Sequence, residues 1–365
     1  MVTSSQSRVD VWMLVSPVCL VVIGLVLLYS ASYPQATGTT LLTSAPVRQG
    51  AYALLGFALL FLVARLDYRL LANVAFLLYS MILLLLVVVL FIGEPGGGIQ
   101  RWIDLKFFLL QPSEFAKPFV AIALAKFFSQ FKEEIQGLRT LAGSLAIVGV
   151  PMGLVYLQPD LGTAMVFTSM WLGMAIMGGI RPLYLGVLAV LGALSTPIVY
   201  LFLLKPYMQQ RLLLFMDPYG DPLGAGYNVL QSEISVGSGG LFGKGLLNGT
   251  QSQLHFLRVQ QTDFIFSVLG EELGFIGGVI LIGLFATLAV RGFKIAERAS
   301  DNFGKNLAVG ITSLLTIQAI VNLSSMVALL PLTGVPLPFI SYGGSALVAN
   351  LTAIGILLNI SRRSS

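Results

Sequence analysis

The sequence predicts an all-helical protein that crosses a membrane many times. Hydrophobic residues make up 56% of its 365 residues, and charged residues only 10%, whereas soluble domains carry about 25% charged residues. The apolar residues gather in long runs, and a membrane-spanning helix needs about 20 of them. The single cysteine, Cys19, excludes an intramolecular disulfide, and the single histidine, His255, excludes a His-rich metal site. We therefore expect one polytopic membrane domain over residues 1–365.

Ten apolar runs are candidate spans, and an even number places both termini on one side of the membrane. The first run has no small-residue cleavage site after it, so we interpret it as a retained span and not as a signal peptide. The fourth to sixth runs are the shortest or most polar. The ten are Val11–Tyr29, Gly50–Ala64, Leu71–Ile92, Ser113–Phe128, Leu141–Leu157, Leu161–Gly178, Leu183–Leu204, Phe264–Val290, Leu307–Leu330 and Phe339–Ile360.

The distribution of Lys and Arg predicts that both termini are cytoplasmic. With the N-terminus inside, thirteen of the 21 Lys and Arg residues fall in inner segments, and cytoplasmic loops are normally the more basic ones. The long connecting segments then lie on the outer side. The longest of them is residues 205–262, between the seventh and eighth spans. We expect any chemistry to face outward. Within the long segment, YNVLQSEISV has the pattern of an amphipathic helix at the interface.

Asp263 lies where the long outer segment meets an apolar span, with Glu271 and Glu272 two turns deeper. Carboxylates at this depth are costly to keep and usually functional. The alternative is a solvated helix cap.

Two further acidic positions lie near outer span ends. In QPSEFAKP, Glu114 and Lys117 are three residues apart, so they share a helix face and can pair. The pair either locks two helices together or forms a polar wall of an outward cavity. In YLQPDLGTA, Asp160 precedes a span, where it suits either a helix N-cap or a site residue.

Gly-rich outer loops carry a cation in GEPGGGIQRW, with Arg101, and in GSGGLFGKG, with Lys244. Such loops either receive phosphate or are merely loops; neither has the Walker spacing, which disfavours an NTP-driven pump. In PLPFISYGGSA, before the last span, we expect non-helical backbone, with Ser341 serving a ligand or satisfying that backbone. Since acids and bases gather at the outer span ends, we expect an outward cavity that can hold an anion.

Five motifs, in this order, closely resemble the SEDS family (shape, elongation, division and sporulation), and most of all its RodA branch. They are QPSEFAKP, QPDLGT, RLLLFMDPYGDPLGAGYNVLQSEISVGSGGLFGKGLLNGTQ, TDFIFSVLGEELGFIGG and GVPLPFISYGGSA. The resemblance runs from about Arg101 to the C-terminus. The chain departs from the family at residues 256–261, where members often carry Pro-Glu before TDF.

The resemblance implies a peptidoglycan glycosyltransferase of the bacterial cytoplasmic membrane. Such proteins polymerise lipid II, an undecaprenyl-pyrophosphate-linked disaccharide-pentapeptide, at the outer face during cell elongation. The resemblance also implies a class B penicillin-binding protein and other elongation-complex proteins as partners. A divalent cation, Mg²⁺ or Mn²⁺, is the expected cofactor, and the Asp of TDF, Asp263, the essential acid.

For this reaction Asp263 is our candidate general base, because an attacking sugar hydroxyl must lose its proton. The leaving pyrophosphate needs positive charge from the protein or a metal. The candidate cavity or substrate-binding residues are Arg101, Glu114, Lys117, Asp160, Lys244, Glu271 and Ser341. The alternative is a flippase for the lipid-linked precursor without chemistry, which requires a polar path through the whole bilayer. A mere scaffold leaves the intramembrane carboxylates unexplained.

Overall fold

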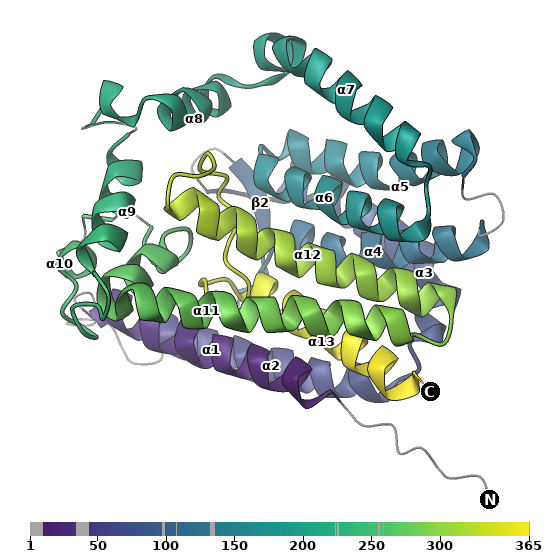
Figure 1. Cartoon of the computed structure of the whole chain (residues 1–365), viewed down its shortest axis with the longest axis horizontal. Helices are drawn as coiled ribbons and strands as arrows, with labels where there is room; N and C mark the ends of the chain where they lie inside the picture. The colour runs from purple at the N-terminus through teal and green to yellow at the C-terminus, as the bar shows by residue number, and fades with distance from the viewer. Residues whose placement is uncertain are drawn as a thin grey trace, which may run out of the picture.

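Ten long helices of the computed structural model coincide with the ten predicted spans (Figure 1). The structure describes residues 10–33, 44–96, 99–106, 108–131, 136–222, 224, 226–254, 256–257 and 259–364. The helices are α1 (Val11–Ser32), α2 (Ala45–Arg65), α3 (Arg69–Ile92), α4 (Pro112–Gln130), α5 (Leu138–Leu157), α6 (Leu161–Gly178), α7 (Pro182–Ile198, continued by the π-helix Val199–Leu203), α11 (Ile265–Arg298), α12 (Asn302–Met326) and α13 (Gly344–Arg363).

Within the described chain, nine of these helices are long and apolar enough to cross a membrane. The protein is therefore a helical, multi-pass membrane protein. The tenth, α4, carries Glu114, Lys117 and Lys126 and is buried along most of its length. The count of ten spans stays a prediction.

Helix ends follow local chemistry. Asp10 and Asp301 cap α1 and α12, accepting hydrogen bonds from the backbone N–H groups of Met13 and Gly304. The helices α2, α4 and α7 begin with a proline in the first turn, where its missing N–H costs nothing. The last helix begins at Gly344, later than the predicted Phe339, because the segment before it is non-helical.

The two described ends of the chain lie at the same end of the bundle (Figure 1). An ion pair of 3.6 Å joins Asp10, before α1, to Arg291 near the end of α11. Ser300, after α11, donates a hydrogen bond of 3.2 Å to the carbonyl oxygen of Arg363 at the end of α13. This arrangement agrees with termini on one side of the membrane; that this side is cytoplasmic stays a prediction.

The opposite end of the bundle carries the structured segments that are predicted to face outward. Between α3 and α4 lie β1 (Glu94–Gly96), β2 (Ile99–Asp104) and β3 (Leu109–Leu110), an antiparallel sheet in the order β1-β2-β3. The sequence analysis did not predict these strands. After α7 follow α8 (Pro206–Met216), a 3₁₀ turn (Pro218–Gly220), α9 (Tyr227–Ser238) and α10 (Thr250–Gln253). The helix predicted at YNVLQSEISV is confirmed as α9.

The helices differ sharply in burial. The central helices α12 and α13 are buried along most of their length, whereas α7 has no buried residue and lies at the edge of the molecule (Figure 1). From α7 the chain passes through α8 towards α9, above the end of the bundle where α11 begins.

A break that the sequence analysis did not predict interrupts α11 at Gly274, whose φ is 66° and ψ −162°. The loop 240–245 fits into it. The N–H groups of Phe275 and Ile276 donate to Gly240 and Leu241, and the carbonyl oxygens of Glu271 and Glu272 accept from the loop. Backbone groups freed by a break at membrane depth need such partners, so the long outer segment is fastened to α11.

Candidate active site

Four helices begin at one large cavity of about 670 Å³. We call this the large cavity. Its lining includes residues at or just before the starts of α4, α6, α11 and α13: Gln111, Asp160, Leu161, Asp263, Gly343 and Gly344. Three of these helix starts, those of α4, α11 and α13, have no side-chain cap. Uncapped N–H groups and the helix dipole make such a place favourable for an anion.

Asp263 is half-buried in the turn just before α11. The N-cap residue of α11 is Phe264, which makes no side-chain cap, so Asp263 is not the capping residue of that helix. Its backbone is held from two sides. Asn322 on α12 donates from Nδ2 to the carbonyl oxygen of Asp263 at 3.3 Å, and Tyr342 donates its backbone N–H to Gln261 at 2.9 Å. The carboxylate therefore faces the large cavity from a fixed backbone.

The surroundings of Asp263 raise the pKa of its carboxyl above the usual range. Loss of hydration is the largest cause, and the positive charge of Arg211 opposes it. A carboxylate with a raised pKa is a stronger base than one in water, which suits it to accept a proton from a hydroxyl group.

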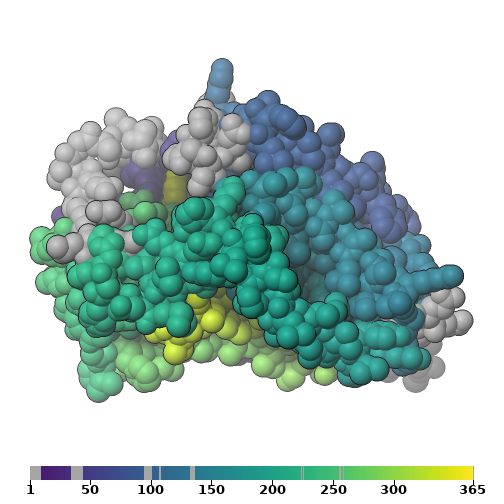
Figure 2. All heavy atoms as spheres, turned by 90° about the horizontal axis from the view of Figure 1, so that it is seen from above, coloured from purple at the N-terminus to yellow at the C-terminus, as the bar shows by residue number. Residues whose placement is uncertain are grey.

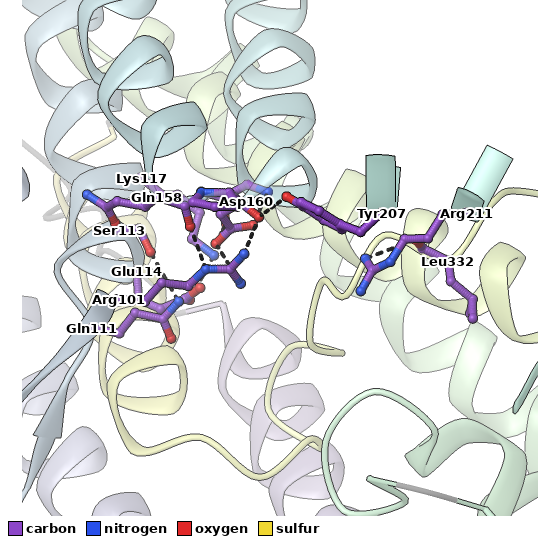
Figure 3. A network of polar contacts seen from close by, with 12 residues as sticks. Arg101, Gln111, Ser113, Glu114, Lys117, Gln158, Asp160, Tyr207, Arg211 and Leu332 are labelled. Atoms are coloured by element: carbon purple, nitrogen blue, oxygen red, sulfur yellow. Dashed lines mark hydrogen bonds and ion pairs between the residues drawn. The ribbon is translucent and has the colours of Figure 1, made fainter. Parts of the chain in front are cut away.

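Arg101 lines the large cavity, and backbone carbonyl oxygens hold its side chain in place (Figure 3). Its guanidinium donates from Nε to the carbonyl oxygen of Gln158 at 2.7 Å and from Nη2 to that of Pro159. Its Nη1 lies 4.0 Å from Oδ2 of Asp160. Arg101 thus joins the β2 strand to the start of α6 and presents its charge beside a carboxylate.

Asp160 caps α6, as one of the two sequence interpretations held. Its carboxylate accepts from the backbone N–H of Thr163 at 3.1 Å and from the Thr163 hydroxyl at 3.0 Å. The same residue lines the large cavity. The cap and the site position are therefore compatible.

Glu114 and Lys117 form the predicted pair, with 2.7 Å between Oε2 and Nζ and only 1% of each side chain exposed. Of the two, Glu114 lines the large cavity, and Lys117 lies behind it. Because both charges are buried, each depends on the other for neutralisation. The pair is a wall of the cavity and also a contact within the bundle.

Two cavity residues of α8, Tyr207 and Arg211, escaped the sequence analysis. Tyr207 donates to the carbonyl oxygen of Pro159 at 3.0 Å, and Arg211 donates from Nη1 to that of Leu332 at 3.3 Å. The Tyr207 hydroxyl thus bonds the same carbonyl oxygen as Arg101, beside Asp160, and Arg211 lies beyond Tyr207 (Figure 3). A signal was available: Arg211 is the one charge within YMQQRLLLFM.

The segment that carries α8 only partly covers this end of the molecule. Seen from the side of α7 and α8, yellow atoms of the C-terminal part of the chain are visible in the hollow beside the teal and green atoms of this segment (Figure 2). The large cavity is thus bordered by α8 and reachable from outside the bundle.

Lys244 and Glu271, both predicted for the cavity, form a separate cluster. Their ion pair measures 2.9 Å, and the Glu271 carboxylate also accepts from the backbone N–H groups of Gln251 and Ser252 at 2.9 and 3.1 Å. Neither residue is part of the large cavity's lining. Glu271 fastens α10 to α11, so its role here is to hold the outer segment.

Ser341 is likewise absent from the lining of the large cavity. Its hydroxyl donates to the carbonyl oxygen of Thr262 at 2.7 Å and accepts from the N–H of Leu337 at 2.9 Å. Of the two roles expected for Ser341, satisfying the backbone is the one seen in the structure.

A resident metal finds limited support in the donor set. Within the described ranges, no group of three or more His, Cys, Asp and Glu side chains is placed to hold a metal ion. Mg²⁺, however, is often bound by one or two protein carboxylates together with substrate phosphates. Asp160 and Asp263, on one cavity, fit that smaller set.

Comparison with known proteins gives matches over nearly the whole chain. The family model for FtsW, RodA and SpoVE, described as "Cell cycle protein", matches residues 11–365. The chain is 41% identical over 306 residues to "Peptidoglycan glycosyltransferase MrdB" of Escherichia coli K12, covering 84% of this chain and 82% of that protein. It is 39% identical to "Probable peptidoglycan glycosyltransferase FtsW" of Geobacter metallireducens, covering 98% and 95%.

Solved structures agree with these matches. The chain resembles one from "Structural coordination of polymerization and crosslinking by a peptidoglycan synthase complex", with a TM-score of 0.81, 33% identity and coverage of 98% and 99%. It also resembles the Thermus thermophilus rod shape determining protein RodA, with a TM-score of 0.69, 30% identity and coverage of 98% for both chains.

Proposed function

The chain belongs to the FtsW/RodA/SpoVE family, also called SEDS, and from that membership we propose that it is a peptidoglycan glycosyltransferase. Relatives of this name match it over more than four fifths of their length. Its substrate in this proposal is lipid II, polymerised into glycan strands at the outer face of the bacterial cytoplasmic membrane during cell elongation.

One observation carries the proposal: three uncapped helix N-termini and a carboxylate with a raised pKa meet at a single cavity. The N-termini and Arg211 suit a pyrophosphate that gains negative charge as it leaves. Asp263 suits the proton of the attacking hydroxyl. Groups for stabilising the leaving pyrophosphate and for accepting the hydroxyl proton are thus present at one cavity.

The proposed step forms one bond and breaks one. The acceptor hydroxyl oxygen bonds to the anomeric carbon of the donor sugar while its proton passes to the Asp263 carboxylate. The bond between that carbon and the pyrophosphate oxygen breaks, and the pyrophosphate leaves with the electron pair. Direct displacement on an α-linked donor gives a β-linked product, so no covalent enzyme intermediate is needed.

A divalent cation is part of the proposal: Asp160 would hold it together with the substrate's phosphates, which leaves Asp263 to accept the proton. When bound, it would neutralise charge on the leaving group. Arg211 contributes positive charge beside it.

The arrangement favours an enzyme over a flippase. Two cavities lined by charged residues lie around Asp263, at the end of the bundle predicted to face outward. Deeper, between α1, α11, α12 and α13, a cavity of about 10 Å³ has only Thr312 and Thr316 as polar residues in its lining. A transporter needs a polar path through the bilayer, and these cavities do not extend along one.

We also propose a class B penicillin-binding protein as the partner that cross-links the glycan. A neighbouring structure comes from a complex whose title joins polymerisation and cross-linking. The step proposed for the large cavity forms only glycosidic bonds, so cross-linking would need a second protein.

The test is polymerisation of labelled lipid II by the purified protein with its partner, in the presence of a transpeptidase-blocking drug. Asp263→Asn should lower the rate by roughly 10²- to 10⁴-fold, the usual contribution of a general base. Asp104→Asn is the matched control, because Asp104 lies on β2 and outside the large cavity. Glycan chains from Asp263→Asn at the wild-type rate would refute the base role. Transbilayer movement of lipid II without chains would identify a flippase instead.

A further inference from the structure

A second cavity of about 370 Å³ adjoins the large one; we call it the side cavity. The two share a wall that includes Tyr207, Arg211, Asp263 and Gly334. A Cβ atom on Gly334 would lie 3.6 Å from Nη1 of Arg211 and 3.8 Å from Oδ2 of Asp263. The candidate base and its cation therefore lie at the boundary between two spaces, each within the size range of ligand pockets.

The two cavities differ in electrostatic character. In the described lining of the side cavity, Arg211 and Asp263 are the only charged residues, both on the shared wall. The side cavity also includes Ser325 and Met326, at the C-terminal end of α12, where the helix dipole is negative. The starts of α9 and α11 also border the side cavity, and the large cavity adds Arg101, Glu114 and Asp160. Away from the shared wall, the large cavity therefore offers Arg101 to an anion, whereas the described lining of the side cavity offers no cation.

Neutral hydrogen-bond acceptors mark the walls of the side cavity. Buried oxygen atoms of Asn228 (Oδ1), Asn322 (Oδ1) and Thr333 (Oγ1) have no hydrogen-bond partner among the described residues. Asn322 is only 2% exposed, and its Nδ2 is already used on the carbonyl oxygens of Asp263 and Val335. Buried polar atoms are nearly always hydrogen-bonded, so each unpaired one calls for a partner.

The matching ligand is uncharged and rich in hydrogen-bond donors. Sugar hydroxyls and an acetamido N–H supply such donors, and apolar residues such as Phe215, Phe264 and Met326 offer surface for the ring. A pyrophosphate supplies acceptors only and meets the negative end of α12. The side cavity therefore fits an N-acetylated sugar and not the charged part of a lipid-linked substrate.

We propose that the side cavity binds the terminal sugar of the acceptor, while the large cavity holds the donor and its pyrophosphate. This inference rests on the proposed function and adds a direction to it. The acceptor hydroxyl reaches Asp263 from the side cavity and the donor carbon reaches it from the large one. The new bond forms across the shared wall, the proton goes to Asp263, and the pyrophosphate leaves into the large cavity on the side away from that wall, towards Arg101.

Thr333→Val removes a hydroxyl that has no described partner, from the wall that the two cavities share. Thr312→Val is the matched control: Thr312 Oγ1 is equally buried and unpaired, but it faces α11 far from both cavities that contain Asp263. Asn228→Leu is the variant that separates the two cavities, because Asn228 lines the side cavity and not the large one. Thermal unfolding in detergent checks that each protein is folded.

Two probes separate the sides of the reaction. One is an acceptor-only disaccharide lipid in which a methylene group replaces the oxygen between the anomeric carbon and the pyrophosphate, so that the pyrophosphate cannot leave. The other is a donor-only glycan lipid whose terminal 4-hydroxyl is removed. Equilibrium binding of each probe is measured first, and the single coupling of the two probes next.

Thr333→Val and Asn228→Leu should weaken binding of the acceptor-only probe roughly 3- to 10-fold, the effect of losing one neutral hydrogen bond. With Asn228→Leu, binding of the donor-only probe should stay within about twofold, as should binding of both probes with Thr312→Val. Weaker donor binding or equal loss of both probes in Asn228→Leu, or no difference of either variant from Thr312→Val, would overturn the proposal. Wild-type protein that binds the acceptor probe in this manner but forms no chains would refute the proposed activity and leave the sugar site standing.

Discussion

The Ser341 hydroxyl donates a hydrogen bond of 2.7 Å to the carbonyl oxygen of Thr262, the residue before Asp263. The same oxygen accepts from the N–H of Leu337 at 2.9 Å. One hydroxyl therefore ties the non-helical segment before α13 to the turn before α11. Because that turn carries the candidate base, Ser341 is a positioning residue that acts through backbone.

Ser341→Ala should slow glycan polymerisation roughly 10- to 100-fold, since small displacements of a reacting group are costly. The apparent KM for lipid II should change little, because Ser341 lies outside the lining of both cavities that contain Asp263. Ser16→Ala is the control: its hydroxyl is also buried but bonds only within α1. A raised KM for lipid II with an unchanged kcat would contradict the positioning role.

Arg211→Gln should move the acid limb of the pH–rate profile to higher pH. The charge of Arg211 lowers the pKa of Asp263 against the raising effect of lost hydration, so its removal raises that pKa further. Activity needs the ionised carboxylate and is lost as pH falls through this pKa. Measurement of kcat/KM from acid to neutral pH checks the shift.

Arg211→Lys keeps the charge and should leave the acid limb near its wild-type position, although it alters the hydrogen bond to Leu332. If Gln and Lys variants share one profile, Asp263 is not the titrating group.

The bundle was predictable because its signals are local. Apolar runs fix the ten long helices, Asp10 and Asp301 are ordinary caps, and the pair Glu114–Lys117 follows from a spacing of three residues on a helix. Asp263 was identified for the same reason, since a charge at the edge of an apolar run is visible in the sequence.

The site was predictable only in part, because its assembly depends on distant segments. Arg211 lies on α8, and no sequence pattern predicts which way that helix faces. Lys244 does not line the large cavity, because it pairs with Glu271, 27 residues later. The break at Gly274 exists only because a loop some 30 residues earlier fills it. Gly274 is one of 39 glycines in this chain, and nothing in the neighbouring sequence indicates that a distant loop pairs with it.

Breaking the pair between Glu114 and Lys117 should destabilise the protein more than removing it whole. Either Glu114→Gln or Lys117→Met leaves one buried charge uncompensated, at a cost of about 3–5 kcal/mol. The double variant removes both charges and should recover much of that loss. Thermal unfolding of the three variants in detergent measures the difference, and additive losses in the double variant would exclude a coupled pair.

Stability should fall at acid pH through Asp301, at the opposite end of the bundle. Although partial burial alone raises the pKa of Asp301, bonds from the Gly304 N–H, the Tyr68 hydroxyl and Arg69 outweigh it and hold the pKa below the usual range. A depressed pKa stabilises the fold above the unfolded-state pKa, and this contribution disappears as pH falls through the folded-state pKa.

Asp301→Ala should cost roughly 0.5–2 kcal/mol at neutral pH, as loss of an N-cap does, and should flatten the acid dependence of the melting temperature. Asp67→Ala is the control for loss of a carboxylate at the same end of the bundle: Asp67 pairs with Arg363 and accepts from the Arg69 N–H, but it is not the N-cap residue of α3. Equal acid sensitivity of wild type and Asp301→Ala would contradict the assignment.

Gly274→Ala should detach the outer segment from α11. The backbone at Gly274, with φ 66° and ψ −162°, is a conformation that only glycine adopts readily. A Cβ there would also lie 2.3 Å from the backbone nitrogen of Gly243. Straightening the helix to relieve this contact would remove the loop's hydrogen bonds with Glu271 and Glu272.

Gly283→Ala provides the comparison on the same helix, because a Cβ at Gly283 meets no atom within 4 Å. Alanine in a regular helix is favoured over glycine by about 0.5–1 kcal/mol, so this variant should melt no lower than wild type. Gly274→Ala should melt lower and expose the loop 240–245 to protease. If the two variants melt alike, the break at Gly274 is not what fastens the outer segment.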